Sequence, residues 1–209
     1  MVVPFDNLDS MMWTVGISAA IIGIMLLKTR YDSTTDSFEG TELKDRIGYI
    51  LTFGGGGLYL FISGLYIYFT WPYGSPFGSQ FQTGFVGAYN NVLFGGVATL
   101  GGLLLVILAL ALYYNGGFKI ASYVGVGFGA YSLCGAYAIL ANSYGKTPIP
   151  SALGYIGFAA AAFFIVPVTH SNNKGLRYLA ALFAFLFAAV WLFEGFNTSL
   201  SHLGAPPVF

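Results

Sequence analysis

The sequence predicts an all-α membrane protein, a single bundle of six transmembrane helices with both chain ends outside. The composition is the first indication, since 56% of the 209 residues are hydrophobic and only 8% are charged. Soluble domains carry roughly 25% charged residues, so water is not the main solvent of this chain. The other two indications are six long apolar stretches and an uneven distribution of Lys and Arg between them.

Six stretches are long enough to cross the hydrocarbon core of a bilayer, which takes about 20 apolar residues in a helix. Polar and apolar residues do not alternate in these stretches as they would in the strands of a membrane barrel. Only helices and closed barrels satisfy the backbone inside lipid, so we expect helices. A single domain, 1–209, then contains spans near 11–27, 47–71, 92–114, 118–141, 149–168 and 178–196.

The basic residues predict the orientation of the bundle. Seven of the eight fall in the first, third and fifth loops, and only Lys146 lies elsewhere. Positively charged loops stay on the cytoplasmic side, so we expect loops 28–46, 115–119 and 169–177 to be cytoplasmic in a cell membrane. Trp13, Trp71 and Trp191 then lie at the outer boundary, where indole rings favour the headgroup layer.

The first loop also carries many carboxylates, which raises the question of a divalent cation. The segment from Asp32 to Glu39 lacks the alternating oxygen ligands and the central glycine of an EF-hand loop. We therefore expect a solvated cytoplasmic loop.

The loop at 72–91 on the outer side has no charge and contains five aromatic residues. Exposed apolar patches usually mark contact sites, so we expect the bundle or another membrane subunit to cover it. The C-terminal tail at 199–209 is also apolar and lies on the outer side, so we expect it to be covered in the same way. The candidate contact residues are Trp71, Pro72, Phe77, Phe81 and Phe85.

Small residues mark the places where membrane helices approach closely. The chain has 29 glycines, among them an uninterrupted run at 54–57 and a GxxxG pair. The run favours a tight helix crossing over an unwound or kinked segment of the kind that lines transporter sites. The candidate packing glycines are Gly54, Gly56, Gly57, Gly125 and Gly129.

Residues that carry chemistry are scarce. His170 and His202 fall on opposite faces of the predicted bundle, and Cys134 is the only cysteine. We expect no cofactor held covalently or through His or Cys, no metal and no catalytic acid–base set. The net charge of zero gives no reason to expect nucleic acid as a partner.

Glu194 is the one candidate for an ion or proton site, because a carboxylate within a span is costly. Its place near the outer end of span six also suits an interfacial anchor. Tyrosines inside the spans could line a site for a quinone or a lipid tail, although ordinary core packing explains them as well.

The segment from Tyr66 to Gly74, with Thr70-Trp71-Pro72 at its centre, precedes the polar loop and a Phe94-Gly95 start to the next span. This pattern resembles an uncharacterised family of archaeal multi-pass membrane proteins. The resemblance implies an archaeal cell membrane, and it brings no activity and no functional residues.

These observations favour a non-catalytic subunit of a larger membrane complex, respiratory or otherwise redox. Its partners would be membrane lipids and other membrane subunits, with lipid or quinone contacts. The alternative is a small ion or solute transporter or channel with Glu194 in the pathway. An enzyme acting on a lipid-soluble substrate is the weakest interpretation, because a general acid and base are missing.

Overall fold

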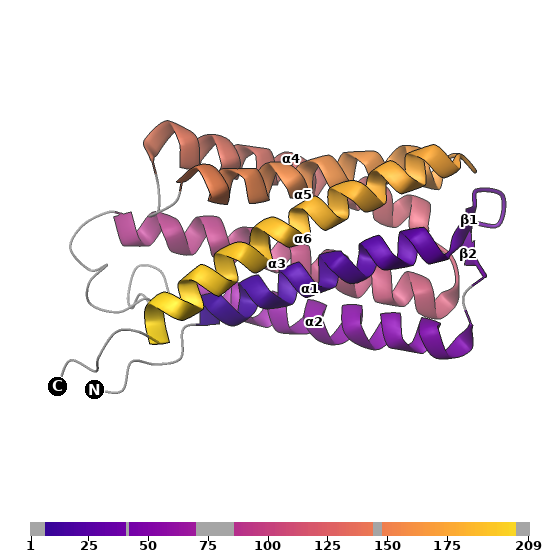
Figure 1. Cartoon of the computed structure of the whole chain (residues 1–209), viewed down its shortest axis with the longest axis horizontal. Helices are drawn as coiled ribbons and strands as arrows, with labels where there is room; N and C mark the ends of the chain where they lie inside the picture. The colour runs from indigo at the N-terminus through magenta and orange to yellow at the C-terminus, as the bar shows by residue number, and fades with distance from the viewer. Residues whose placement is uncertain (1–6, 41, 70–85, 144–147, 204–209) are drawn as a thin grey trace.

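The computed structural model describes residues 7–40, 42–69, 86–143 and 148–203, and the described chain is a bundle of six long helices with one small hairpin (Figure 1). All six are long and apolar enough to cross a membrane, which confirms the predicted all-α bundle of six spans. The side of the membrane that the chain ends face stays a prediction. The helices are α1 (Asn7–Lys28), α2 (Leu43–Phe69), α3 (Val86–Tyr114), α4 (Phe118–Asn142), α5 (Pro148–Thr169) and α6 (Lys174–Leu203), and the hairpin strands are β1 (Arg30–Asp32) and β2 (Ser37–Glu39).

Several helices extend past the apolar stretches of the sequence. The last helix runs from Lys174 to Leu203, whereas its apolar stretch covers only 178–196. Polar and basic residues continue a helix into the headgroup layer, where water and lipid headgroups solvate their side chains. The unwound alternative at glycines 54–57 is excluded, because α2 is helical from Leu43 to Phe69. Inside hydrocarbon, an unwound backbone would leave amide and carbonyl groups without hydrogen bonds.

The six helices are arranged as three closely packed pairs: α2 with α3, α4 with α5, and α1 with α6. The first and last helices of the chain therefore lie side by side, and α5 also packs on α6 (Figure 1). Other combinations of helices are in less extensive contact. The three pairs therefore surround the middle of the bundle, and no helix runs through it.

The contact between α2 and α3 depends on four glycines. A Cβ at Gly57 would lie 2.8 Å from the carbonyl oxygen of Gly102, and one at Gly64 would lie 2.8 Å from that of Gly95. The glycines on each helix are two turns apart, and the helices are antiparallel, so both pairs meet in the same register. Side chains larger than hydrogen would hold the two backbones apart.

The glycines singled out from the sequence face different neighbours. Gly57 belongs to the α2–α3 contact. A Cβ at Gly56 would lie 3.2 Å from a side-chain atom of α1, and one at Gly129 would lie 3.1 Å from a side-chain atom of α5. At Gly54 and Gly125 the nearest atom would be 3.7 Å away, which is an ordinary contact distance.

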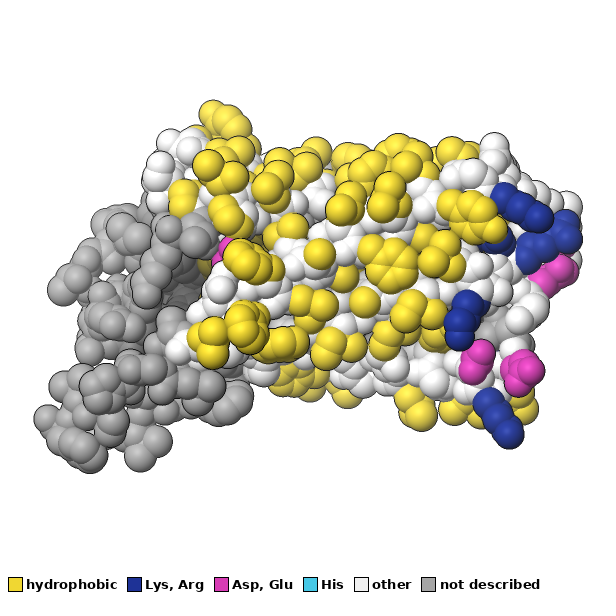
Figure 2. All heavy atoms as spheres, viewed as in Figure 1, with side chains coloured by type: hydrophobic (Ala, Val, Ile, Leu, Met, Phe, Trp, Pro, Cys, Tyr) yellow, Lys and Arg dark blue, Asp and Glu magenta, His cyan; other side chains and the backbone are white. Residues whose placement is uncertain are grey.

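Charged side chains gather at one end of the bundle, where the hairpin, the turn between α3 and α4 and the turn between α5 and α6 meet. We call this the charged end and the opposite end the far end. Figure 2 shows basic and acidic side chains at the charged end and a mostly hydrophobic lateral surface. Leucines on this lateral surface are well exposed, for example Leu51 at 69%. Such a surface suits contact with lipid tails or with another membrane helix.

The first loop is not fully solvated as expected, because part of it folds under the bundle as the hairpin. Tyr31 pairs with Phe38 across the two antiparallel strands, and both side chains are buried. These are the two aromatic residues of an otherwise polar loop, and burying them removes apolar surface from water.

Candidate functional site

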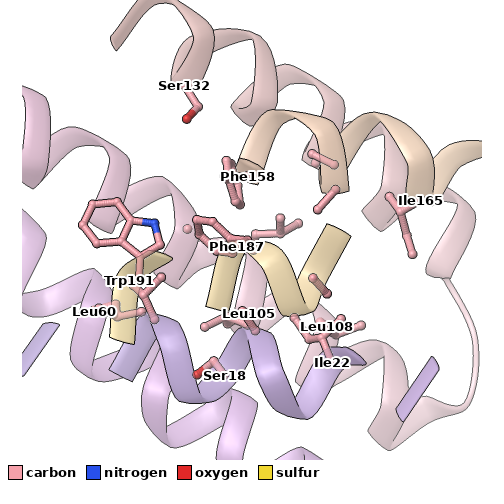
Figure 3. A pocket seen from close by; sticks show the side chains of 18 of the residues that line it. Ser18, Ile22, Leu60, Leu105, Leu108, Ser132, Phe158, Ile165, Phe187 and Trp191 are labelled. Carbon is pink, nitrogen blue, oxygen red and sulfur yellow. The ribbon is translucent and has the colours of Figure 1, made fainter. Parts of the chain in front are cut away.

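An apolar cavity of about 200 Å³ lies along the middle of the bundle (Figure 3). Side chains from all six helices line it, together with Phe38 of β2. Figure 3 places Trp191, Leu60 and Ser132 toward one end of the cavity and Ile165, Leu108 and Ile22 toward the other. The lining is mostly aliphatic and aromatic, so the cavity matches a hydrophobic molecule rather than an ion.

Most of the hydroxyl groups in the wall are bonded to the protein itself. Ser132 Oγ donates to the carbonyl oxygen of Tyr155 at 2.9 Å, and thereby ties α4 to α5. Near the charged end, Thr169 Oγ1 donates to Ser122 Oγ at 3.1 Å, and Ser122 Oγ donates to the carbonyl oxygen of Lys119 at 2.6 Å. These bonds fix the wall and leave its inner surface apolar.

Two buried donors in the wall are exceptions. The hydroxyl of Tyr155 and the indole Nε1 of Trp191 have no hydrogen-bond partner among the described residues. Their rings lie side by side with centroids 6.0 Å apart, and both residues line the cavity toward the far end. A buried donor without an acceptor costs about 1–3 kcal/mol, so these two groups favour a bound molecule with an acceptor oxygen.

The charged end of the cavity is closed by aromatic rings. Phe38 and Phe118 line the cavity there and meet edge to face with centroids 4.8 Å apart. Tyr31 packs against both rings, at 5.1 Å from Phe38 and 6.3 Å from Phe118. The hairpin of β1 and β2 therefore closes the cavity at the charged end, and we call it the hairpin plug.

Asp36 attaches this plug to the start of α4. Its carboxylate accepts the backbone N–H of Gly117 at 3.0 Å, the backbone N–H of Lys119 at 3.1 Å and the hydroxyl of Tyr31 at 2.5 Å. Lys119 Nζ donates in return to the carbonyl oxygen of Ser33 at 2.7 Å. Burial and then the bond to Asp36 raise the pKa of the Tyr31 hydroxyl well above its usual range, so it stays a donor.

The structure places Glu194 on α6 with only 6% of its surface exposed, so its side chain lies within the bundle. It is three residues beyond Trp191, near the far end of the cavity. The expected contact residues Trp71, Pro72, Phe77, Phe81 and Phe85 lie outside the described residues.

His170 is exposed at the charged end, where its Nε2 lies 2.8 Å from the hydroxyl of Tyr123. Cys134 is exposed on α4. Within the described ranges, no three His, Cys, Asp or Glu side chains come together as a possible metal site.

Sequence reasoning missed the cavity, the two donors and the plug. Each depends on residues from different helices that meet only after packing. The signal that was available is the presence of Tyr31 and Phe38 in a charged loop, since aromatic side chains there favour burial.

The fold and the cavity together define a polytopic membrane protein with an apolar cavity between its helices. A family profile described as "Protein of unknown function (DUF981)" matches residues 1–205, so the chain belongs to this family. No curated protein and no solved structure matches it.

Proposed function

We propose that this protein is a non-catalytic membrane protein that holds the apolar part of a lipid or a quinone in the central cavity. The observation that carries this proposal is the cavity itself, about 200 Å³ in volume and lined by apolar side chains. A dry apolar cavity of about 150 Å³ is enough to bind benzene, so a quinone ring or several carbons of a chain would fit.

The chemistry of the far end narrows the choice of ligand. The Tyr155 hydroxyl and the Trp191 indole N–H are two donors without partners among the described residues. A quinone carbonyl or a lipid ester carbonyl supplies an acceptor for them, whereas a plain hydrocarbon does not. We therefore favour a lipid-soluble molecule with a carbonyl group at one end of an apolar body.

The test is to purify the protein in a mild detergent and identify the bound small molecules by mass spectrometry. Ala184 is 4% exposed and lines the cavity, so Ala184→Phe would fill part of it. Leu182→Phe on the same helix is the matched control, because Leu182 is 52% exposed on the lateral surface. Tyr155→Phe removes only the hydroxyl and keeps the ring.

We expect a quinone or a lipid to copurify with the unaltered protein and with Leu182→Phe, and to be depleted in the other two variants. Added quinone should quench the fluorescence of Trp191 in a saturable manner, and Tyr155→Phe should weaken this binding about tenfold through loss of one hydrogen bond. Equal recovery of the same molecule from all four proteins would overturn the proposal.

The protein would act within a larger membrane assembly, respiratory or otherwise redox. The exposed apolar side chains along its lateral surface support contact with other membrane helices as well as with lipid. Loops 28–46, 115–119 and 169–177 would face the cytoplasm, which their basic residues support. A native mass equal to one chain in mild detergent, with no copurifying subunit, would count against the assembly.

A small transporter is the second candidate, and the burial of Glu194 favours it. A carboxyl within a membrane bundle is a candidate ion or proton site, and this one lies one helical turn beyond a residue of the cavity wall. Ion or proton flux into proteoliposomes should then fall in Glu194→Gln. Flux that is unchanged by Glu194→Gln and by Gly56→Leu would remove this candidate.

A further inference from the structure

A second cavity, of about 190 Å³, lies at the charged end between β1, the end of α5 and the start of α6. Three cationic side chains line it: Arg30, Lys174 and Arg177. The other residues in its wall are uncharged, and no Asp or Glu of the described chain is among them. This cavity is polar, unlike the central one, and its chemistry is independent of whatever occupies the centre.

Arg177 is the residue that points most strongly to a ligand. Only 8% of its surface is exposed, and its Nε has no hydrogen-bond partner among the described residues. Its guanidinium lies 5.4 Å from the ring centroid of Tyr178, which is a weak cation–π contact. A buried guanidinium needs an anion to offset the loss of hydration, and none of the described residues supplies one.

The start of α6 adds to the positive potential of the cavity. Asn173 caps the helix, since its Oδ1 accepts the backbone N–H of Gly175 at 2.8 Å. The Arg177 amide donates to the carbonyl oxygen of Asn173 at 3.3 Å. The amides of Lys174 and Leu176 have no carbonyl of the preceding turn to bond, and the helix dipole places partial positive charge there. Helix N-termini of this kind bind phosphate groups.

Two acidic residues of the hairpin neighbour residues of the cavity wall. Glu39 of β2 pairs with Arg30 across the two strands, and Asp32 follows Tyr31 at the end of β1. The Asp32 carboxylate is bonded to Thr34, from the backbone N–H at 2.9 Å and from the hydroxyl at 2.7 Å. These bonds lower the pKa of Asp32, so it stays charged at neutral pH. Neither Asp32 nor Glu39 is among the residues that line the cavity, so the wall itself carries only positive charge.

We infer that this cavity binds one phosphate group, contributed either by the headgroup of an acidic phospholipid or by a free phosphate. The Arg177 guanidinium would donate in bidentate fashion to two phosphate oxygens, which suits its planar geometry. Lys174 and Arg30 would contribute charge from the rim, since both are exposed. The cavity lies where α5 ends and α6 begins, so it is reachable from the headgroup layer and from water.

The experiment uses the full chain and separates the two sources of phosphate. In the first arm, native mass spectrometry follows retention of added phosphatidylglycerol against phosphatidylcholine in detergent. In the second arm, thermal unfolding is followed in phosphatidylcholine nanodiscs with inorganic phosphate or chloride at equal ionic strength. The variants are Arg177→Gln and Lys174→Gln, and Lys44→Gln is the matched control, because Lys44 is an exposed lysine in the first turn of α2.

The inference predicts one phosphatidylglycerol retained per chain, or a rise in Tm with inorganic phosphate, and the positive arm identifies the source. Arg177→Gln should weaken binding about tenfold or more, since a charge-assisted hydrogen bond is lost, and Lys174→Gln should weaken it less. Lys44→Gln should bind as the unaltered protein does.

No response in either arm would overturn the inference, and so would equal losses in Lys44→Gln and Lys174→Gln. Because Lys174 is exposed, its substitution tests the site even if Arg177→Gln does not fold.

Discussion

The close contact between α2 and α3 gives the sharpest prediction, which concerns Gly102→Ala. A Cβ at this position would lie 2.4 Å from the backbone nitrogen of Phe61 and 2.6 Å from the carbonyl oxygen of Gly57. Both are backbone atoms of a continuous helix, so neither can rotate away as a side chain can. Ordinary contact begins near 3.4 Å, so the two helices must separate locally by about 1 Å.

The magnitude follows from two opposing effects. Separation of the helices costs about 1–3 kcal/mol, as overpacking does in other tightly packed interiors. Replacing a helical glycine with alanine returns about 1 kcal/mol of helix propensity. Gly55→Ala isolates the steric effect, because Gly55 is also within α2 and a Cβ there meets nothing within 4 Å. We expect Gly102→Ala to be about 2 kcal/mol less stable than Gly55→Ala, and its Tm about 5 °C lower.

Thermal unfolding in detergent, followed by tryptophan fluorescence and by recovery of the monodisperse protein, measures this difference. A Tm of Gly102→Ala equal to or above that of Gly55→Ala would refute the reasoning. In that case the backbones of α2 and α3 would not be in contact at Gly102.

Two further predictions concern the hairpin plug. Asp36→Asn should loosen the hairpin, since a neutral amide oxygen is a weaker acceptor for the Gly117 and Lys119 amides. Limited trypsin digestion should then cleave faster in the hairpin. Glu42→Gln is the control, because Glu42 is exposed and lies outside the hairpin, and it should not change the rate. Equal digestion of both variants would contradict this role. The raised pKa of Tyr31 means that its contribution to stability is full below a pH of about 10 and is lost as the pH rises through the higher folded-state pKa. The Tm difference between the unaltered protein and Tyr31→Phe should therefore shrink above about pH 10, and a difference that grows there would argue against the bond to Asp36.

The sequence allowed the role of a single residue to be predicted only where that role depends on neighbouring residues in the chain. The glycine run at 54–57 indicated a contact in α2, yet only Gly57 of the run meets the backbone of α3. Its partner Gly102, and the pair formed by Gly64 and Gly95, could not be selected among 29 glycines, because the rotation of each helix about its axis is set by its neighbours.

The sequence by itself determined that the chain is a bundle of six apolar helices, since hydrocarbon admits no unpaired backbone and the length of each apolar stretch sets a span. It also placed the basic residues in alternate loops, which the structure gathers at one end of the bundle. Only the tertiary structure decided which helices pair, where a cavity remains between the pairs, and that Tyr155, Trp191 and Arg177 are buried as donors without partners among the described residues. These features depend on side chains far apart in the chain. Lipid solvates every apolar face of a helix almost equally well, so no periodic pattern in the sequence indicates which face packs against the other helices.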